Sequence, residues 1–560
     1  MRRAVQRTVE FERVAALPRR QLSQRDADAW AHALTPELLC RGASGALRPW
    51  QAYSLAECAE NKGGLLGLPV GFGKTLLMWA LPTVMGARRP MIILPAGLEP
   101  KTRADFRMLR GVWRAPNPSP VLVSKEELAR ESNAYLLDRH QPDLIMVEES
   151  DDLANAGVGA PRRISRYVLP RTRDEVAVVT LTGTLTRTSI MGFWHHLLWC
   201  LRENAPVPWD ESEARMWAAA LDNTRGGIPP SPGPLGPSRS AALDWFFRRV
   251  SETPGVVLVD GDSAGDVPLH VRVRVAQECG ILDGHFERFM LDHENPRGIP
   301  VSTPLDRWCT GGQLGCGLCQ YWDPAPPADW VEARRVSAAF VREAIQRTTY
   351  STRPLDTEAQ VSRAYPDEPA VSDWLAVRHK FKGTTAVEWL SDATLSTAVD
   401  WLAESPEPGI VWCGSVEFAA ALSTITGLSY YGAKGQDARG RGLHHADPKR
   451  SMICSWHANK RGYNLQAWRR NAVFLPPQSA KYLEQTIGRS HRANQDRPVV
   501  FDIFATHGGT YDAFDAAISE ARFAKRTTGL TQKILRAEIT VEEPTVTASN
   551  EFRWARAERD

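Results

Sequence analysis

Short apolar runs alternate with amphipathic stretches over the first two hundred residues. The amphipathic stretch 49–60 predicts a helix, and each apolar run has the length of a buried strand; these runs are 64–68, 91–94, 121–123, 144–147 and 176–181. Apolar strands separated by helical segments are typical of a parallel sheet that is covered on both faces. We therefore expect an α/β lobe over residues 41–200.

A second region with the same alternation lies near the end of the chain. Its apolar runs predict strands over 410–412, 451–455, 472–475 and 499–504. We expect these strands to form a second α/β lobe over residues 396–525.

The segment between the lobes, residues 201–395, has a different pattern. It predicts helices over 240–250, 329–347 and 371–379, and one alternating strand over 271–275. Five prolines within residues 228–237 predict a stiff connector or an exposed loop. We expect a mostly helical insertion here, a basic leader over residues 1–40 that includes Arg2 and Arg3, and a C-terminal tail over residues 526–560.

Composition narrows the class of protein. A chain of 560 residues exceeds one ordinary domain, and 43% hydrophobic residues suit globular cores. No apolar run approaches the length of a membrane span, and no apolar segment follows the basic N-terminal residues, so we expect neither a membrane protein nor a secretory signal. Nine cysteines, an odd number, argue against a disulfide framework and favour a reducing, cytoplasmic setting.

The net charge of +3 conceals an uneven distribution. Residues 431–500 carry 13 Lys and Arg against 4 Asp and Glu, a net charge of +9, so the rest of the chain sums to 3 − 9 = −6. A basic second lobe suits phosphate groups and a nucleic-acid backbone.

A glycine-rich turn follows the first predicted strand. Gly71-Phe72-Gly73-Lys74-Thr75 opens a helix, and backbone N–H groups at a helix N-terminus bind phosphate. In such a loop Lys74 reaches the β/γ-phosphates and Thr75 offers its hydroxyl to Mg²⁺. Leu68 replaces the first glycine of the full P-loop pattern, and a bare helix-opening turn is the alternative.

An apolar strand ends in two carboxylates, Glu148 and Glu149. Ligands bind at the carboxyl edge of open α/β sheets, so Glu148 would hold Mg²⁺ and Glu149 would orient or deprotonate the attacking water. A solvated acidic loop is the alternative, because Asp151 and Asp152 extend the acidic run.

The sequence Gln485-Thr486-Ile487-Gly488-Arg489-Ser490-His491-Arg492 places two arginines three residues apart. On a helix Arg489 and Arg492 would share one face, from which they could stabilise charge on a γ-phosphate. Ordinary surface arginines are the alternative.

These segments, in this order, resemble the motifs of superfamily-two helicases, and most closely those of the Swi/Snf-related ATPases that move on duplex DNA. Leu47-Arg48-Pro49-Trp50-Gln51 is similar to their adenine-reading entry motif, and Gly71–Thr75 to motif I. Residues 93–98 and 121–124 resemble motifs Ia and Ib, and residues 181–184 motif III. Residues 410–413, 461–466 and 485–492 resemble motifs IV, V and VI.

The resemblance implies a P-loop NTPase with two RecA-like lobes that hold ATP and Mg²⁺ between them. The nucleotide would contact Gln51, Gly71, Gly73, Lys74, Thr75, Glu148, Gly462 and Gln485, with Thr75 and Glu148 as the magnesium ligands. Catalysis would depend on Glu149, Lys74, Arg489 and Arg492. DNA would contact Pro95, Ala96, Gly97, Ser124, Thr184 and Asn464.

The expected function is that of an ATP-dependent DNA translocase or helicase, a monomeric motor in the cytoplasm of a bacterium or of a phage-infected cell. Duplex DNA is the favoured partner, single-stranded DNA a possible one, and RNA is less favoured. The family's acidic box begins with aspartate where this chain has Glu148, and this departure motivates an alternative, an ATP-gated nucleic-acid clamp with weak hydrolysis. Leu185-Thr186-Arg187 also departs from the family after motif III.

A cysteine cluster in the insertion, Cys309, Cys316 and Cys319, invites a zinc site. A fourth ligand at a recognised spacing is missing, so we favour a turn with buried thiols, whereas zinc would suggest a regulatory or scaffold protein. The aromatic, proline-rich segment 321–330 is expected to be a packing corner rather than a base-stacking platform.

Overall fold

The computed structural model describes residues 4–222, 229–301, 303–348, 355–459 and 462–553. The chain forms two compact units, each an α/β structure. The first unit comprises Met1–Ser263 with Glu520–Gln532, and the second comprises Ala264–Ser519 with Lys533–Asp560. The expected residues Arg2, Arg3, Ile228 and Arg461 lie outside the described part of the chain.

The first unit contains a parallel sheet with six strands among the described residues, in the order β3-β2-β4-β5-β1-β6. These strands are β1 (Gly64–Gly67), β2 (Pro90–Leu94), β3 (Val121–Ser124), β4 (Leu144–Glu148), β5 (Ala177–Thr182) and β6 (Val256–Leu258). The five apolar runs expected from the sequence therefore form neighbouring strands of one sheet.

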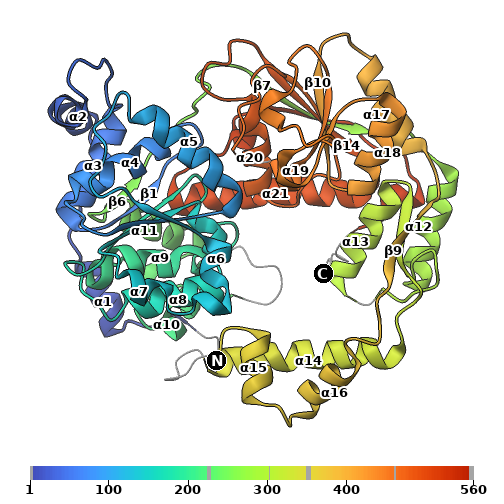
Figure 1. Ribbon diagram of the computed structural model, residues 1–560, viewed down its shortest axis with the longest axis horizontal. Helices are drawn as coiled ribbons and strands as arrows, with labels where there is room; N and C mark the ends of the chain where they lie inside the picture. The colour runs from blue at the N-terminus through green and yellow to red at the C-terminus, as the bar shows by residue number, and fades with distance from the viewer. Residues whose placement is uncertain (1–3, 223–228, 302, 349–354, 460–461, 554–560) are drawn as a thin grey trace. The chain divides into compact units, whose positions relative to one another are not determined.

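Helices cover both faces of this sheet (Figure 1). Alternate residues of a strand enter different cores: Leu65 packs in one hydrophobic cluster and Leu66 in the other, as a period of two requires. One layer contains α2 (Gln24–Leu38), α3 (Pro49–Asn61), α4 (Lys74–Val84) and α5 (Glu99–Leu109). The other contains α1 (Val9–Ala16), α6 (Lys125–Ala129), α7 (Leu136–His140), α8 (Gly159–Val168), α9 (Met191–Leu201), α10 (Glu211–Leu221) and α11 (Arg239–Ser251).

The second unit contains a parallel sheet with seven strands among the described residues, in the order β11-β12-β10-β13-β14-β7-β15. These strands are β7 (Leu269–Val275), β10 (Gly409–Cys413), β11 (Tyr430–Tyr431), β12 (Met452–Ser455), β13 (Arg470–Phe474), β14 (Val499–Ala505) and β15 (Glu538–Val541). The flanking helices are α17 (Ala393–Ala403), α18 (Val416–Thr426), α19 (Trp456–Asn459), α20 (Ala480–Ser490) and α21 (Gly508–Thr528), whose last residues belong to the first unit.

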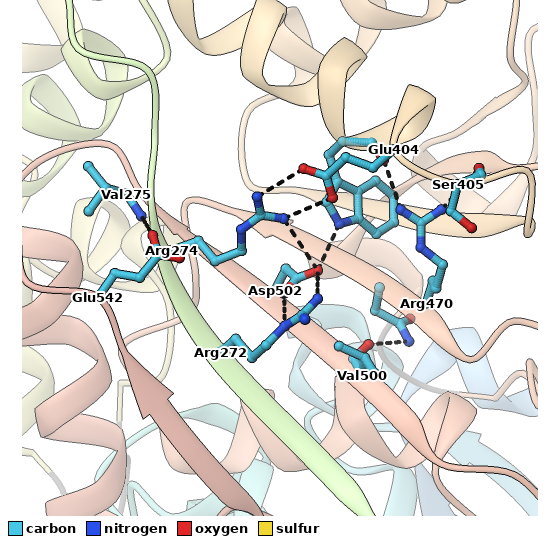
Figure 2. A network of polar contacts seen from close by, with 11 residues as sticks. Arg272, Arg274, Val275, Glu404, Ser405, Arg470, Val500, Asp502 and Glu542 are labelled. Atoms are coloured by element: carbon cyan, nitrogen blue, oxygen red, sulfur yellow. Dashed lines mark hydrogen bonds and ion pairs between the residues drawn. The ribbon is translucent and has the colours of Figure 1, made fainter.

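A polar network secures β7 in this sheet (Figure 2). The buried carboxylate of Asp502 on β14 accepts two hydrogen bonds from Arg272 on β7, at 2.6 and 2.8 Å, and one from the indole of Trp401, at 2.8 Å. Arg274 forms an ion pair with Glu404 at 2.9 Å. This arrangement explains why apolar and basic residues alternate along β7. Its valines enter the core, while its arginines neutralise the carboxylates of Asp502 and Glu404.

Most of the remaining elements of the second unit lie between β7 and α17 in the chain. It consists of α12 (Gly280–Asp292), α13 (Pro304–Gly315), β8 (Leu318–Asp323), α14 (Ala328–Arg347), α15 (Glu358–Ala364), α16 (Pro369–Val377) and β9 (Thr384–Trp389). Strands β8 and β9 pair antiparallel. The short helix α22 (Ala548–Glu551) packs on α12. Among the described helices none is long and apolar enough to cross a membrane.

The units divide the chain differently from the expected domains. The described part of the expected leader, residues 4–40, contains α1 and α2, whose Val14 and Ala27 are fully buried in the first unit. Residues 201–263 of the expected insertion also belong to that unit, because β6 pairs with β1. The proline-rich segment 229–237 lies within it as well, where Leu235 is buried, so it does not connect the units.

The expected C-terminal tail is also part of the folded units. Leu530 packs in the core of the first unit, and β15 forms an edge of the second sheet beside β7. Sequence patterns missed these assignments because β6, β7 and β15 are separated from their partner strands by about 190 to 270 residues, and period alone does not identify partners.

Candidate functional site

The carboxyl edge of the first sheet gathers the segments expected to carry chemistry. The strands are parallel, so the loop after β1, Pro95–Gly97 after β2, Ser124 on β3, Glu148 on β4 and Thr184 after β5 all lie at one edge. The register places Gly67 opposite Thr182, and Glu148 opposite Leu181 on the other side of β5. One strand therefore separates the glycine-rich loop from the acidic strand end, a spacing of about 10 Å between strand axes.

Two glycines shape the loop between β1 and α4. Gly71 and Gly73 have φ values of +89° and +79°, in the left-handed region that favours glycine. A Cβ atom on Gly73 would lie 2.2 Å from the Nε2 atom of Gln51, so a side chain has no room there. Gly73 is the N-cap of α4 and supplies no side-chain cap, which leaves the N–H groups of the first turn to other acceptors.

Gln51 and Arg48 hold this loop from α3. The side-chain amide of Gln51 donates to the carbonyl of Phe72 at 3.0 Å, and its oxygen accepts from the Arg48 amide at 2.9 Å. The Arg48 guanidinium donates to the carbonyl of Gly71 at 3.3 Å. Gln51 is buried, so the residue expected to contact adenine positions the loop in this structure.

Lys74 folds back over its own loop. Its Nζ atom donates to the carbonyls of Leu68 and Pro69 at 3.0 and 3.2 Å, and the side chain is buried. A Cβ atom on Gly183 would lie 3.7 Å from Nζ, so the ammonium group also lies near the loop after β5. Thr75, the next residue of α4, is half-buried.

Glu148 is a buried carboxylate at the end of β4. Its Oε2 atom has no hydrogen-bond partner in the described part of the chain. Burial and the neighbouring Glu149 raise the pKa of Glu148, and the positive charges of Lys74, Lys125 and Lys101 oppose them, so that the pKa is about 7. The Oε2 atom of Glu148 is therefore a buried oxygen that a cation or a hydrogen-bond donor could satisfy.

Glu149 begins the turn after β4. Its φ of +48° is unusual for a residue with a side chain, and the backbone at this point leaves the strand. Lys125 donates a hydrogen bond to the carbonyl of Glu149 and forms an ion pair with Asp152 at 3.5 Å. Lys125 thus braces the acidic segment, a role that its position one residue after β3 did not indicate.

The residues expected to contact DNA in the first unit are engaged in local contacts. Ser124 caps α6 by accepting from the Glu127 amide at 2.9 Å, and the Ala96 amide donates to Glu126 at 3.0 Å. Thr184 is buried, and its amide donates to the Thr182 hydroxyl at 3.0 Å. Ala96 and Gly97 are exposed at the sheet edge, whereas Pro95 is buried.

In the second unit the structure brings the segments resembling motifs V and VI together. Arg489 is buried near the end of α20; its Nε donates to the Gln485 carbonyl at 2.9 Å and its Nη1 to the Tyr463 carbonyl at 3.0 Å. The Leu465 amide donates to the Arg489 carbonyl at 3.0 Å. Arg489 therefore anchors the segment that follows Gly462.

Arg492 differs from Arg489 in position. Helix α20 ends at Ser490, so the two arginines do not share a helical face, and that expectation is wrong. The Arg492 side chain is half-buried and donates to Asn464 and to the Tyr463 carbonyl, the latter at 3.4 Å. His491 between them turns inward and contacts the Val267 carbonyl at 2.8 Å, which ends the regular helix.

The residues of the first unit fit a phosphate group with a divalent cation. The loop offers left-handed glycines and N–H groups at a helix start, Lys74 supplies a buried positive charge, and Glu148 supplies a buried oxygen without a hydrogen-bond partner. Ser263 is a further candidate, because its buried Oγ lies 2.7 Å from where a Cβ on Gly71 would be. No local pattern indicates Ser263, which lies 192 residues from Gly71.

The cysteine cluster is distributed over different environments. Cys309 is exposed, Cys316 is buried in the core beneath β10, and Cys319 is buried on β8. Burial raises the pKa of the Cys316 thiol, which opposes the thiolate that a metal requires. Within the described ranges no group of three or more His, Cys, Asp or Glu side chains is arranged to hold a metal ion.

A scan against models of protein families found no match, and a search of curated protein sequences found none either.

Proposed function

We propose that this chain is a P-loop NTPase built from two RecA-like lobes. More specifically, we propose an ATP-dependent DNA translocase or helicase of superfamily two, related to the Swi/Snf ATPases. The observation that carries the proposal is the common edge of the first sheet, where the glycine-rich loop, Lys74 and Glu148 converge from segments about 75 residues apart.

The order of segments along the chain supports the same assignment. Eight stretches between residues 47 and 492 follow the order of the helicase motifs. The contact between Arg489 and Tyr463 further supports it, because two segments that resemble consecutive motifs of one lobe pack together. The basic region 431–500 suits a polyanionic partner, and duplex DNA is favoured.

In the proposed mechanism Lys74 and the loop amides would bind and orient the nucleotide phosphates, and Thr75 and Glu148 would hold Mg²⁺. Magnesium supplies charge neutralisation on the phosphates when it is bound. Glu149 would position the attacking water molecule. Arg492, which belongs to the second unit, would stabilise negative charge on the γ-phosphate. Lobes that close on ATP and open after hydrolysis would bias the grip on DNA.

The test is an ATPase assay with no polymer, with single-stranded DNA, with duplex DNA and with RNA. We expect the strongest stimulation by duplex DNA, and we expect Lys74→Ala to abolish turnover. Arg88→Ala is a matched control, because Arg88 lies on the loop before β2, at the opposite edge of the sheet. Absence of polymer-stimulated turnover in the unmodified chain would refute the motor assignment.

A second candidate function is an ATP-gated DNA clamp. It is favoured by Glu148, whose side chain is one methylene longer than the family's aspartate and is buried without a partner for Oε2. ATP-dependent DNA binding without turnover, with turnover gained in Glu148→Asp, would support the clamp. Turnover that falls in Glu148→Asp would support the motor.

A further inference from the structure

The described residues between the antiparallel strands β8 and β9, 324–348 and 355–383, form a helical excursion. We refer to this excursion as the arm. Its long helix α14 packs against α15 and α16 (Figure 1). In its described part the arm contributes no strand to either parallel sheet, and it contains none of the nucleotide-site residues proposed above.

Four aromatic rings from different elements meet at the base of the arm. Trp330 on α14 is buried at their centre, with ring centroids 5.5 Å from Trp322 on β8, 5.3 Å from Trp374 on α16 and 5.1 Å from Phe381. The rings pack mostly edge to face, the favoured geometry for aromatic pairs. The expected packing corner is therefore present, but Trp322 remains 37% exposed.

These rings line a hollow of about 680 Å³ that is open to solvent. The charged or titratable side chains that line it are Arg334, Arg378, His379 and Lys382. In the part of the chain that the structure describes, no carboxylate lines the hollow. The Arg334 guanidinium lies over the rings of Trp330 and Trp322, at 5.3 and 5.8 Å from their centroids. The hollow thus combines flat aromatic faces with concentrated positive charge.

The positive charge is concentrated in the hollow, because the arm as a whole also carries acidic side chains. Its acidic side chains include Glu332, which pairs with Arg335 on α14, and Glu343, which pairs with Arg347. Within the described residues, no carboxylate forms an ion pair with Arg334, Arg378 or Lys382, which are all exposed. Positive charge without a partner beside aromatic rings matches a ligand that is both anionic and aromatic.

We infer that the hollow of the arm binds single-stranded nucleic acid, taking one unstacked base against Trp322 and Phe381 and its flanking phosphates on Arg334, Arg378 and Lys382. A base presents a flat face to an aromatic ring or to a guanidinium plane, and this contact tolerates any sequence. The volume of the hollow lies within the range of small-ligand pockets, which have volumes of about 300–1,000 Å³.

An anionic membrane surface is a less suitable occupant. Aromatic residues that anchor proteins at membranes project from a surface, whereas Trp330 and its neighbours line a concave hollow. The inference does not rest on the proposed ATPase function, because no residue of the hollow belongs to the nucleotide site. Its test therefore uses the full chain without ATP.

The probes are a fluorescently labelled thymidine 12-mer and an abasic 12-mer, which keeps the phosphates and lacks the bases. Trp322→Ala removes the exposed ring, and its matched control is Trp389→Ala, which removes an exposed tryptophan on β9 outside the hollow. Arg334→Glu reverses a charge of the hollow, and its control is Arg335→Glu, the neighbouring exposed arginine on α14.

We expect Trp322→Ala to weaken binding of the thymidine 12-mer about tenfold and to leave binding of the abasic 12-mer nearly unchanged. Arg334→Glu should weaken both and lower the slope of log affinity against log salt by about 0.7. Both controls should bind like the unmodified chain, and melting temperatures should match within each pair.

Equal affinities for Trp322→Ala and Trp389→Ala, or for Arg334→Glu and Arg335→Glu, would overturn the inference. The same conclusion would follow if Trp322→Ala lost sedimentation with phosphatidylserine vesicles while keeping its affinity for the thymidine 12-mer. Loss of ATPase activity in Lys74→Ala with unchanged 12-mer binding would leave the inference standing, so the two proposals fail independently.

Discussion

Single buried side chains determine the properties of the candidate site. Glu148 has a carboxylate that is not matched by a hydrogen bond at Oε2, and Lys74 donates to two carbonyls of its own loop. Each group therefore carries a cost in the structure that a bound phosphate or cation would relieve, since buried charges are stable only when paired. The same two residues would be unremarkable on a solvated surface.

His195 on α9 links the acidic segment to the helix layer. Its Nε2 atom lies 2.7 Å from the Leu153 carbonyl, four residues after Glu149, and burial lowers its pKa to about 4. In the folded chain His195 stays neutral down to about pH 4, whereas in the unfolded chain it takes up a proton near pH 6.5. The stabilisation by neutral His195 is therefore complete above pH 6.5 and is lost as the pH falls toward 4.

We predict that His195→Gln, which keeps a donor and does not titrate, removes this pH dependence. Between pH 7 and pH 4 the unmodified chain should lose about 3 kcal/mol more free energy of unfolding than the variant. Urea unfolding at several pH values measures the difference, and His32→Gln on the exposed side of α2 is the control. Parallel curves for His195→Gln and the unmodified chain would contradict the prediction.

At the scale of elements, helix α20 separates two arginines that appear equivalent in the sequence. Arg489 lies within the helix and holds the backbone at Tyr463, whereas Arg492 lies past its end beside Asn464. The first arrangement is suited to fixing a loop, and the second to reaching a ligand. The division arises because His491 leaves the helical conformation, with φ −91° and ψ 89°.

We predict that Arg489→Ala mainly lowers stability, whereas Arg492→Ala mainly lowers ATPase turnover. Arg489→Ala removes the guanidinium that donates to the Gln485 and Tyr463 carbonyls and should lower the free energy of unfolding by about 1–3 kcal/mol. Arg492→Ala should change stability by less than about 1 kcal/mol, yet lower the ATPase turnover about 10³-fold while ATP binding persists.

Thermal unfolding, binding of a fluorescent ATP analogue and steady-state turnover measure these effects. Unchanged turnover in Arg492→Ala would exclude it as an arginine finger. Unchanged stability in Arg489→Ala would show that the Tyr463 contact does not anchor the loop.

At the scale of the whole molecule, the C-terminal residues are shared between the two units. Leu530 packs in the core of the first unit, while the Lys533 amide donates to Glu484 at 2.6 Å and β15 extends the second sheet. Each unit is thus completed by chain that follows the apparent end of the second lobe. The expected domain boundary after residue 525 would separate each unit from part of its own chain.

We predict that a chain ending at Lys525 is destabilised by at least about 3 kcal/mol, since it lacks a buried leucine and an edge strand. A chain ending at Arg553 retains every described residue and is the control. Differential scanning calorimetry should show lower melting temperatures for the first truncation alone. Equal melting of the two truncated chains would mean that residues 526–553 contribute little to either unit.

The amino-acid sequence by itself determined most strands, some of the helices and the site candidates. Apolar runs of four to six residues, such as 144–147, cannot remain in water, and a glycine-rich turn before a helix is a local signal. The α/β class and the strands of both sheets, apart from β6, β11 and β15, followed from these patterns.

Only the tertiary structure decided which strands pair and which charged groups meet. Nothing local marks β6 as the neighbour of β1, Lys125 as the brace of Glu149, or the rings of Trp322 and Trp374 as walls of one hollow. These contacts join residues far apart in the chain, and they form because burying apolar surface offsets the entropy of closing long loops. Local periodicity carries no information about that balance.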